Sequence, residues 1–193
     1  MLKIAVCVSG GGTNLQAIID GIEQKTITNT EIAVVISNNP GAYALERAKK
    51  HGIEAVCISP KEYESRAAFN EDFLRRLDAY EVDLVVLAGF LVRVPDLLLH
   101  AYPGKIINIH PALLPKFGGK GMYGDKVHEA VVAAGEKESG ITIHYINEHY
   151  DEGSIIFQAT CPVLPDDSPE EVAKKVHALE YEHFPRIVEE ILG

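Results

Sequence analysis

The chain has 193 residues, with 18 Lys or Arg against 28 Asp or Glu, so its formal net charge is −10 when histidine is neutral. This length and a hydrophobic content of 47% are typical of a globular protein with a substantial core and exclude a disordered or fibrous one. The acidic balance argues against nucleic-acid binding, because Lys and Arg supply most of the affinity for phosphate backbones. We expect one domain over residues 1–193.

The spacing of the cysteines and the length of the apolar runs indicate the cellular compartment. Cys7, Cys57 and Cys161 lie far apart and form no Cys-x-x-Cys pair, which favours reduced thiols. The first apolar run, residues 4–8, is too short for a signal peptide, and residues 84–92 fall well short of the roughly 20 residues of a membrane span. We therefore expect a cytoplasmic protein with neither a secretion signal nor a membrane-spanning segment.

Short β-branched runs alternate with segments of helical period along most of the chain. Strands are predicted over residues 3–8, 31–37, 54–58, 83–88 and 105–110. Helices are predicted from residue 13, where Thr13 to Gln16 fits a capping box, and over residues 41–50, 65–77 and 125–134. This alternation indicates an α/β fold with a single doubly wound, mostly parallel, Rossmann-like sheet.

The pattern changes after residue 138. Two strand-like runs, residues 140–146 and 154–161, are joined by residues 147–153, whose Asp-Glu-Gly ending suits a hairpin. They predict a C-terminal antiparallel hairpin at the edge of the sheet. A closing helix is expected after Ser168, because a Ser cap is followed by Pro169 at the first helical position. Pro185 should kink or restart this helix.

Residues 9–14, with the sequence Ser-Gly-Gly-Gly-Thr-Asn, lie between the first predicted strand and the first helix. In a doubly wound sheet this turn borders the ligand crevice, and its free N–H groups form an anion site together with the helix dipole. The segment lacks the third glycine of a dinucleotide fingerprint and the Gly-Lys-Ser/Thr of a P-loop. A compact phosphate therefore fits better than a dinucleotide or ATP. The alternative is a tight turn whose glycines only permit close packing.

Asn108 and His110 share one face of a buried strand, opposite Ile107 and Ile109, at its carboxyl end. Asn can donate a hydrogen bond to a carbonyl oxygen while His transfers a proton, a pairing suited to acyl transfer through a tetrahedral intermediate. The alternative is a hydrogen-bonded core histidine that ends a strand. Asp151, taken alone, is typical of a turn.

Other chemistries have little support in the sequence. The eight histidines show no metal-ligand spacing, so we expect no metal, and no serine or cysteine nucleophile motif is present. The acidic charge is concentrated after residue 165, where eight carboxylates face three basic residues. Residues 105–126 carry four lysines against one Asp, which predicts positive surroundings for His110.

Four segments resemble the phosphoribosylglycinamide formyltransferase family, in the same order over nearly the whole chain. They are residues 9–17 (SGGGTNLQA), 86–90 (VLAGF), 108–115 (NIHPALLP) and 150–153 (YDEG). The resemblance implies a doubly wound sheet with the active site at the strand ends. It also implies transfer of a formyl group from 10-formyltetrahydrofolate, the co-substrate, to the amine of glycinamide ribonucleotide (GAR) in purine biosynthesis.

The resemblance implies roles for individual residues. Asn108, His110 and Asp151 are similar in position to the catalytic trio of the family. In direct transfer, Asn108 and protonated His110 stabilise the oxyanion, and Asp151 keeps His110 charged. The residues similar to GAR contacts are Gly12, Thr13, Asn14, His177 and Glu180. The residues similar to folate contacts are Arg66, Leu91, Val92, Arg93, Val94, Asn108, Asn147, Glu148 and Asp151.

The sequence departs from the family mainly in the loop of residues 116–123, which is several residues longer than usual. Two related folate enzymes share the Asn-x-His motif, 10-formyltetrahydrofolate hydrolase and methionyl-tRNA formyltransferase, and both usually carry another domain. A further alternative is a catalytically silent module that binds a phosphosugar. We expect a monomer or weak homodimer that acts on small molecules and binds neither nucleic acid nor membranes.

Overall fold

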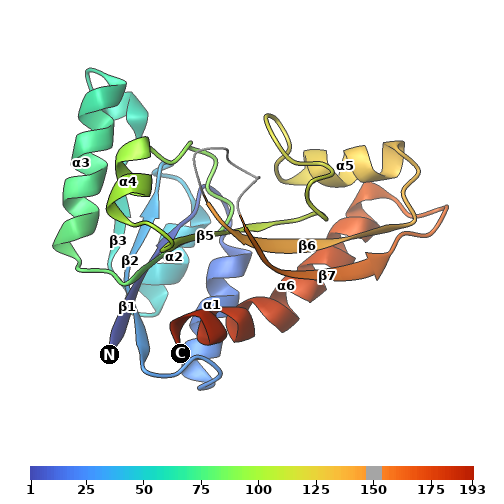
Figure 1. Cartoon of the computed structure of the whole chain (residues 1–193), viewed down its shortest axis with the longest axis horizontal. Helices are drawn as coiled ribbons and strands as arrows, with labels where there is room; N and C mark the ends of the chain where they lie inside the picture. The colour runs from blue at the N-terminus through green and yellow to red at the C-terminus, as the bar shows by residue number, and fades with distance from the viewer. Residues whose placement is uncertain (147–153) are drawn as a thin grey trace.

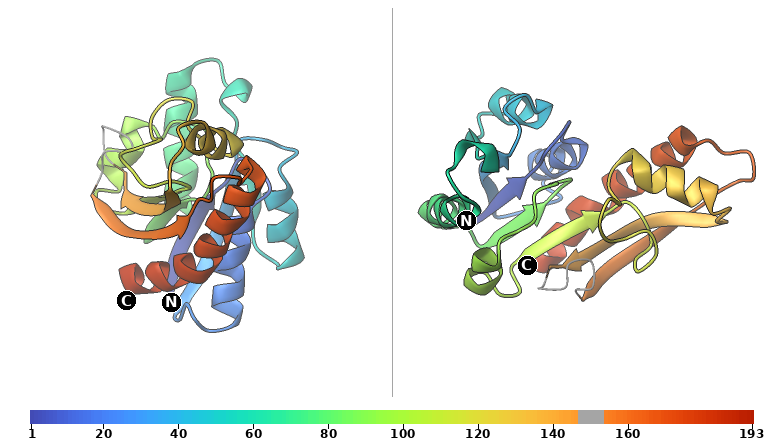
Figure 2. Two further views of the ribbon diagram at one scale, coloured as in Figure 1. Left: turned by 90° about the vertical axis from the view of Figure 1, so that its right-hand side faces the viewer. Right: turned by 90° about the horizontal axis from the view of Figure 1, so that it is seen from above.

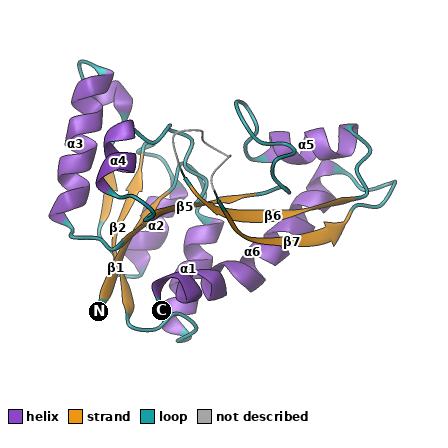
Figure 3. Ribbon diagram, viewed as in Figure 1, coloured by secondary structure: helices purple, strands orange, loops and turns teal. Residues whose placement is uncertain are grey.

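The computed structural model describes residues 1–146 and 154–193. Its described strands form one seven-stranded sheet with the order β3-β2-β1-β4-β5-β6-β7 (Figure 3). The pairs from β3 to β5 are parallel, whereas β6 pairs antiparallel with β5 and with β7. The predicted sheet with an antiparallel edge is confirmed. The strands are β1 (Leu2–Cys7), β2 (Thr30–Ser37), β3 (Ala55–Cys57), β4 (Leu84–Leu87), β5 (Ile106–His110), β6 (Glu138–Tyr145) and β7 (Ile155–Pro162).

Helices cover both faces of the sheet (Figures 1 and 2). Buried side chains of α3 and α4 pack on one face, and those of α1, α2, α5 and α6 pack on the other. The sequence did not predict α4 or the 3₁₀ helix η1, because both are too short to show a helical period. The helices are α1 (Thr13–Glu23), α2 (Tyr43–Lys50), η1 (Pro60–Glu62), α3 (Arg66–Ala79), α4 (Asp96–Ala101), α5 (Asp125–Ala133) and α6 (Pro169–Leu192).

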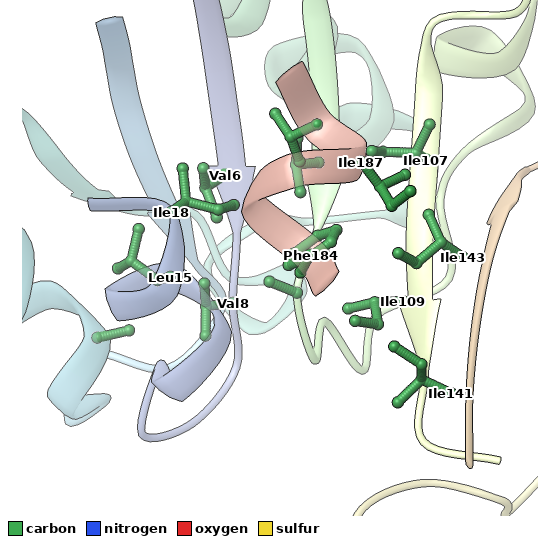
Figure 4. Close-up of a cluster of buried hydrophobic side chains, with 14 of the residues drawn as sticks. Val6, Val8, Leu15, Ile18, Ile107, Ile109, Ile141, Ile143, Phe184 and Ile187 are labelled. Atoms are coloured by element: carbon green, nitrogen blue, oxygen red, sulfur yellow. The ribbon is translucent and has the colours of Figure 1, made fainter. Parts of the chain in front are cut away.

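The central strands are apolar on both faces because both faces are covered. In β1, Ile4 and Val6 belong to the core on the side of α1 and α6, while Ala5 and Cys7 belong to the core on the side of α3. Figure 4 shows Phe184 and Ile187 of α6 wedged between the residues of α1 and those of β5 and β6. Phe184 is fully buried, so α6 closes the sheet as an integral part of the core.

The order of the strands reverses between β1 and β4, since β2 and β3 lie beyond β1 whereas β5 lies beyond β4. In open α/β sheets, ligands bind in the crevice at such a reversal, outside the carboxyl ends of the strands. The connections that leave β1, β4 and β5 border this crevice. They contain the glycine turn, residues 88–95 and residues 111–124.

Helix α6 begins with a capping box, as Ser168 predicts. The hydroxyl of Ser168 accepts a hydrogen bond from the N–H of Glu171 at 3.2 Å, and the Glu171 carboxylate accepts one from the N–H of Ser168 at 3.4 Å. The helix does not restart at Pro185, which lies inside it, but its axis changes direction in the C-terminal part, as expected of a kink (Figure 1). Within the described ranges, no helix combines the length and apolarity needed to cross a bilayer.

Replacing Ser168 with Ala should lower the free energy of unfolding by about 1 kcal/mol, because the first turn of α6 loses its cap. Urea denaturation measures the change. Ser168→Asp, which can still accept the hydrogen bond, should retain most of the stability. Equal losses in the two variants would show that the cap contributes nothing.

Candidate active site

A cavity of about 1170 Å³ lies at the carboxyl ends of β1, β4 and β5. Its walls come from the glycine turn, the segment after β4, the end of β5 with the loop that follows, and parts of α5 and α6. A cavity of this size accommodates ligands larger than a single sugar phosphate. The residues that line it are Val8 to Asn14, Ala88 to Leu91, Arg93, Asn108 to Pro111, Pro115, Gly118 to Asp125, His128, His177 and Glu180.

Most of the predicted site residues meet in this cavity, although they are distant in sequence. They are Gly12, Thr13, Asn14, Leu91, Arg93, Asn108, His110, His177 and Glu180.

Three predicted folate contacts do not line the cavity. Arg66 is exposed and lies over the ring of Phe69, 5.5 Å from its centroid. Val94 is buried in the core on the α3 side, and Val92 packs against that core. Their side chains are therefore engaged in packing contacts. Asn147, Glu148 and Asp151 lie outside the described residues.

The glycine turn leads directly into α1. Gly12 is the N-cap residue and has a left-handed backbone, with φ of 80°, and no side chain of the described residues caps the helix. The predicted capping box is wrong: Gln16 instead donates to Asp20 at 2.9 Å and accepts from Arg47 at 3.1 Å. The first-turn N–H groups of α1 therefore have no side-chain cap and suit an anion.

Ser9 joins the glycine turn to the segment after β4. Its hydroxyl donates to the side-chain oxygen of Asn38 at 2.6 Å and accepts from the N–H of Leu91 at 2.8 Å. The bond to Leu91 holds two walls of the cavity together. Ser9 belongs to the predicted glycine turn, but the sequence pattern predicts no separate role for it.

Glu180 of α6 connects the closing helix with the glycine turn. It is 4% exposed, and its two carboxylate oxygens accept hydrogen bonds from the side-chain amide of Asn14 and, at 3.0 Å, from Nδ1 of His177. The hydrogen bond to Glu180 raises the pKa of His177, although partial burial opposes the rise. A histidine with a raised pKa is well suited to an anion that enters at the start of α1.

The His177–Glu180 pair should make stability depend on pH. A pKa that is higher in the folded than in the unfolded chain stabilises the fold below the unfolded value of about 6.5, and this contribution is lost as pH rises through the folded value. Because the side chain of His177 is 53% exposed, we expect His177→Gln to lower the free energy of unfolding by less than about 1 kcal/mol near pH 6 and by less still above pH 8. Urea denaturation at both pH values measures the difference; an equal effect at both would contradict the ionic contribution.

Asn108 and His110 project from the face of β5 opposite Ile107 and Ile109, which lie in the core on the α6 side, as predicted. The amide nitrogen of Asn108 lies 3.1 Å from Nε2 of His144, which is paired with it in register on β6. His144 is fully buried, and its Nδ1 lies 3.3 Å from the carbonyl of Tyr145. In this network Nδ1 of His144 donates to the carbonyl, and Nε2 accepts from Asn108. One N–H of the Asn108 amide is therefore engaged by His144, and the other N–H of that amide can donate to a ligand.

His110 is 5% exposed, and its Nε2 donates to the carbonyl oxygen of Phe117 at 2.7 Å. Phe117 has a left-handed backbone, with φ of 56°, in the long loop after β5. His110 is thus buried and hydrogen-bonded, as expected of a core histidine that ends a strand. It also lines the cavity, as expected of a catalytic residue. The loop carbonyl sets the orientation of the ring toward the cavity.

The segment between β5 and this loop is attached to the antiparallel edge of the sheet. The hydroxyl of Thr142 donates to the carbonyl of Ala112 at 2.7 Å and accepts from the N–H of Leu114 at 3.0 Å. Gln158 of β7 donates to Thr142 and to the carbonyl of Leu114, both at 3.0 Å. The role of Thr142 was not predicted, although it stands two residues before His144 and repeats the spacing of Asn108 and His110.

The charge around the cavity differs from the prediction. Of the four lysines in residues 105–126, Lys120 is the one among the described lining residues. Lys116 pairs instead with Glu136 at 3.2 Å, whereas Lys126 lies over the ring of Tyr123, which lines the cavity. Among the described lining residues, Arg93 and Lys120 are thus balanced by Asp125 and Glu180, so the net charge of this part of the wall depends on its three histidines. Outside residues 147–153, no cluster of three or more His, Cys, Asp or Glu could hold a metal ion.

Comparisons with known proteins agree with this geometry. The model of the formyl transferase family matches residues 2–188. Phosphoribosylglycinamide formyltransferase of Bacillus subtilis (strain 168) is 38% identical over 193 residues, which cover 100% of this chain and 96% of that protein. The crystal structure of glycinamide ribonucleotide transformylase 1 from Geobacillus kaustophilus is 38% identical, with 100% of both chains covered and a TM-score of 0.93.

A longer relative shows the same similarity over part of its length. The trifunctional purine biosynthetic protein adenosine-3 of Drosophila melanogaster is 40% identical over 185 residues, which cover 95% of this chain, and the chain spans 13% of that protein. The matched region of the family model includes the glycine turn, Asn108 and His110. The chain belongs to the formyl transferase family, among the phosphoribosylglycinamide formyltransferases.

Proposed function

We propose that the chain transfers the formyl group of 10-formyltetrahydrofolate to the amine of GAR, giving formyl-GAR and tetrahydrofolate, in purine biosynthesis. The observation that carries this proposal is that one cavity has an uncapped helix start at one wall and the Asn108–His110 pair at another. The first suits the phosphate of a ribonucleotide, and the second suits a tetrahedral intermediate. The names of the relatives support the same substrates.

In the proposed mechanism, the GAR amine attacks the formyl carbon, and a bond between amine nitrogen and carbon forms. The free N–H of Asn108 and protonated His110 stabilise the oxyanion that develops. The bond between the carbon and the folate nitrogen then breaks, the attacking amine loses a proton, and the departing nitrogen gains one. Asp151, which lies outside the described residues, is proposed to keep His110 charged.

GAR is proposed to bind with its phosphate at Gly12, Thr13 and Asn14 and next to His177 and Glu180, all of which line the cavity. The folate is proposed to bind along residues 91–94, with Arg93 at the cavity wall. Because the side chains of Val92 and Val94 contact the core, the backbone of this segment would make its folate contacts. Arg66, Asn147, Glu148 and Asp151 complete the proposed folate contacts.

An assay of tetrahydrofolate formation with and without GAR tests the proposed function. Strict dependence of product on GAR is the expected result. Release of formate and tetrahydrofolate without GAR would indicate a hydrolase instead. Binding of GAR with no product under any condition would indicate a module that only binds a phosphosugar.

We also propose a cytoplasmic protein that is a monomer or weak homodimer. The free cysteines support a reducing compartment, since Cys7 and Cys161 are buried and Cys57 is half-buried without a disulfide. The exposed large apolar side chains of the described residues are spread over different elements, including Tyr43 and Leu164, which supports a small interface or none. Sedimentation velocity over a range of protein concentrations tests the oligomeric state.

A further inference from the structure

His128 is a buried histidine of the cavity wall that the proposed transfer mechanism does not use. It lies on the second turn of α5, is 3% exposed and lines the cavity. Its Nδ1 is buried and has no hydrogen-bond partner among the described residues. Buried polar atoms are nearly always paired, so an unpaired atom in a residue that lines a ligand cavity points to a partner that arrives with the ligand.

The neighbours of His128 connect it with the proposed phosphate site. Its ring lies 6.4 Å from that of His177, centroid to centroid, with the planes at 73°. His177 is hydrogen-bonded to Glu180, and Glu180 accepts from Asn14 at the start of α1. A continuous series of contacts therefore runs from the glycine turn across α6 to His128.

The charges that face His128 come from three elements. Burial lowers its pKa, and His177 of α6 lowers it further; Glu180 of α6 and Asp125 of its own helix raise it, and His110 of β5 lowers it. The balance leaves the imidazole neutral in the ligand-free protein near neutral pH. A phosphate monoester carries a charge of about −1.5 to −2 at pH 7, which would reverse this balance by favouring the protonated ring.

We propose that His128 is a further ligand for the phosphate of GAR and that it takes up a proton when the ribonucleotide binds. This inference rests on the proposed function, because it assumes that GAR occupies the cavity. Protonated His128 would donate to a phosphate oxygen beside His177 and the first-turn N–H groups of α1. The phosphate would thus be bound by two histidines and the start of α1. No lysine or arginine of α6 is among the described residues that line the cavity.

Calorimetric titration with GAR at pH 7.5, repeated in buffers of different ionisation enthalpy, tests the inference. The wild type should take up a measurable fraction of a proton more than His128→Asn, and the variant should bind GAR about tenfold or more weakly. Glycinamide riboside, which lacks the phosphate, should bind the two proteins equally. His51→Asn, at an exposed histidine paired with Glu23 outside the cavity, is the matched control and should behave as the wild type.

Nuclear magnetic resonance of the wild type supplies a second readout that does not depend on the folding of the variant. The titration midpoint of the His128 imidazole should rise by about one pH unit or more when GAR is bound. An unchanged midpoint, or an equal loss of affinity for GAR and the riboside, would overturn the inference alone. Failure of the wild type to bind GAR would overturn both the inference and the proposed function.

Discussion

His110→Ala is expected to lower kcat for formyl transfer by about a hundredfold or more. His110 lies at the end of β5, and its Nε2 is oriented by the carbonyl of Phe117, so the ring is held at the cavity wall before substrate binds. Without the imidazole, Asn108 alone would stabilise the developing oxyanion. The KM for GAR should change little, because the phosphate is proposed to bind at the start of α1 and next to α6.

Steady-state formation of tetrahydrofolate measures this effect, and circular dichroism establishes that the variant is folded. His51→Ala removes an exposed histidine outside the cavity and should keep the activity of the wild type. A kcat of His110→Ala within a few-fold of the wild-type value would show that His110 is a structural core histidine and has no catalytic role.

Gly12→Ala is expected to disturb both stability and GAR binding. A Cβ at this position would lie 2.8 Å from Cβ and 3.0 Å from Cα of Ala44, and the φ of 80° disfavours any side chain. Strain and overpacking together cost about 2–5 kcal/mol, a large share of the roughly 5–15 kcal/mol of a typical domain. Because the shifted turn includes the start of α1, the KM for GAR should also rise by about tenfold or more.

Gly11→Ala is the matched control for stability, since a Cβ on Gly11 would meet no atom within 4 Å and its backbone is not left-handed. Its free energy of unfolding should stay within about 0.5 kcal/mol of the wild type. Adding Ala44→Gly to Gly12→Ala removes the contact at 2.8 Å but neither the contact with Cα of residue 44 at 3.0 Å nor the backbone strain, so only part of the lost stability should return. Equal stability of Gly12→Ala and Gly11→Ala would show that the turn accommodates a side chain at either position.

Local patterns predicted most of the secondary structure because the period of the apolar residues follows directly from strand and helix geometry. The strands around Ile4 and Ile107 and the cap at Ser168 lie where the patterns place them. The capping box at Thr13 was wrong because Gln16 is engaged by Arg47, which belongs to α2 and is 31 residues away. A tertiary contact of this kind competes with the local capping motif, and the residues of the motif themselves do not indicate it.

The candidate site was predictable only in part. The glycine turn, Asn108 and His110 are recognisable because each lies on one short segment whose geometry follows from its own residues. His144 and Thr142 could have been suggested by their position on one face of a strand, but their partners on β5 and in its loop depend on strand order and register. Among the described residues, the positive charge predicted around His110 is reduced because Lys116 pairs with Glu136, whereas Lys126 lies over Tyr123 at the cavity wall.

The sequence by itself determined the α/β class, the glycine turn before α1 and the polar pair at the end of β5, whereas the absence of a side-chain cap on α1 came from the tertiary structure. The first three features depend on residues close together in the chain, and backbone geometry is a local property. Only the tertiary structure placed Glu180 against Asn14, Phe117 against His110 and His128 beside His177. Packing of α5, α6 and the long loop against the sheet decides those distances. The net charge of −10 likewise says little about the cavity, whose lining in the described part of the chain has two cations, two carboxylates and three histidines.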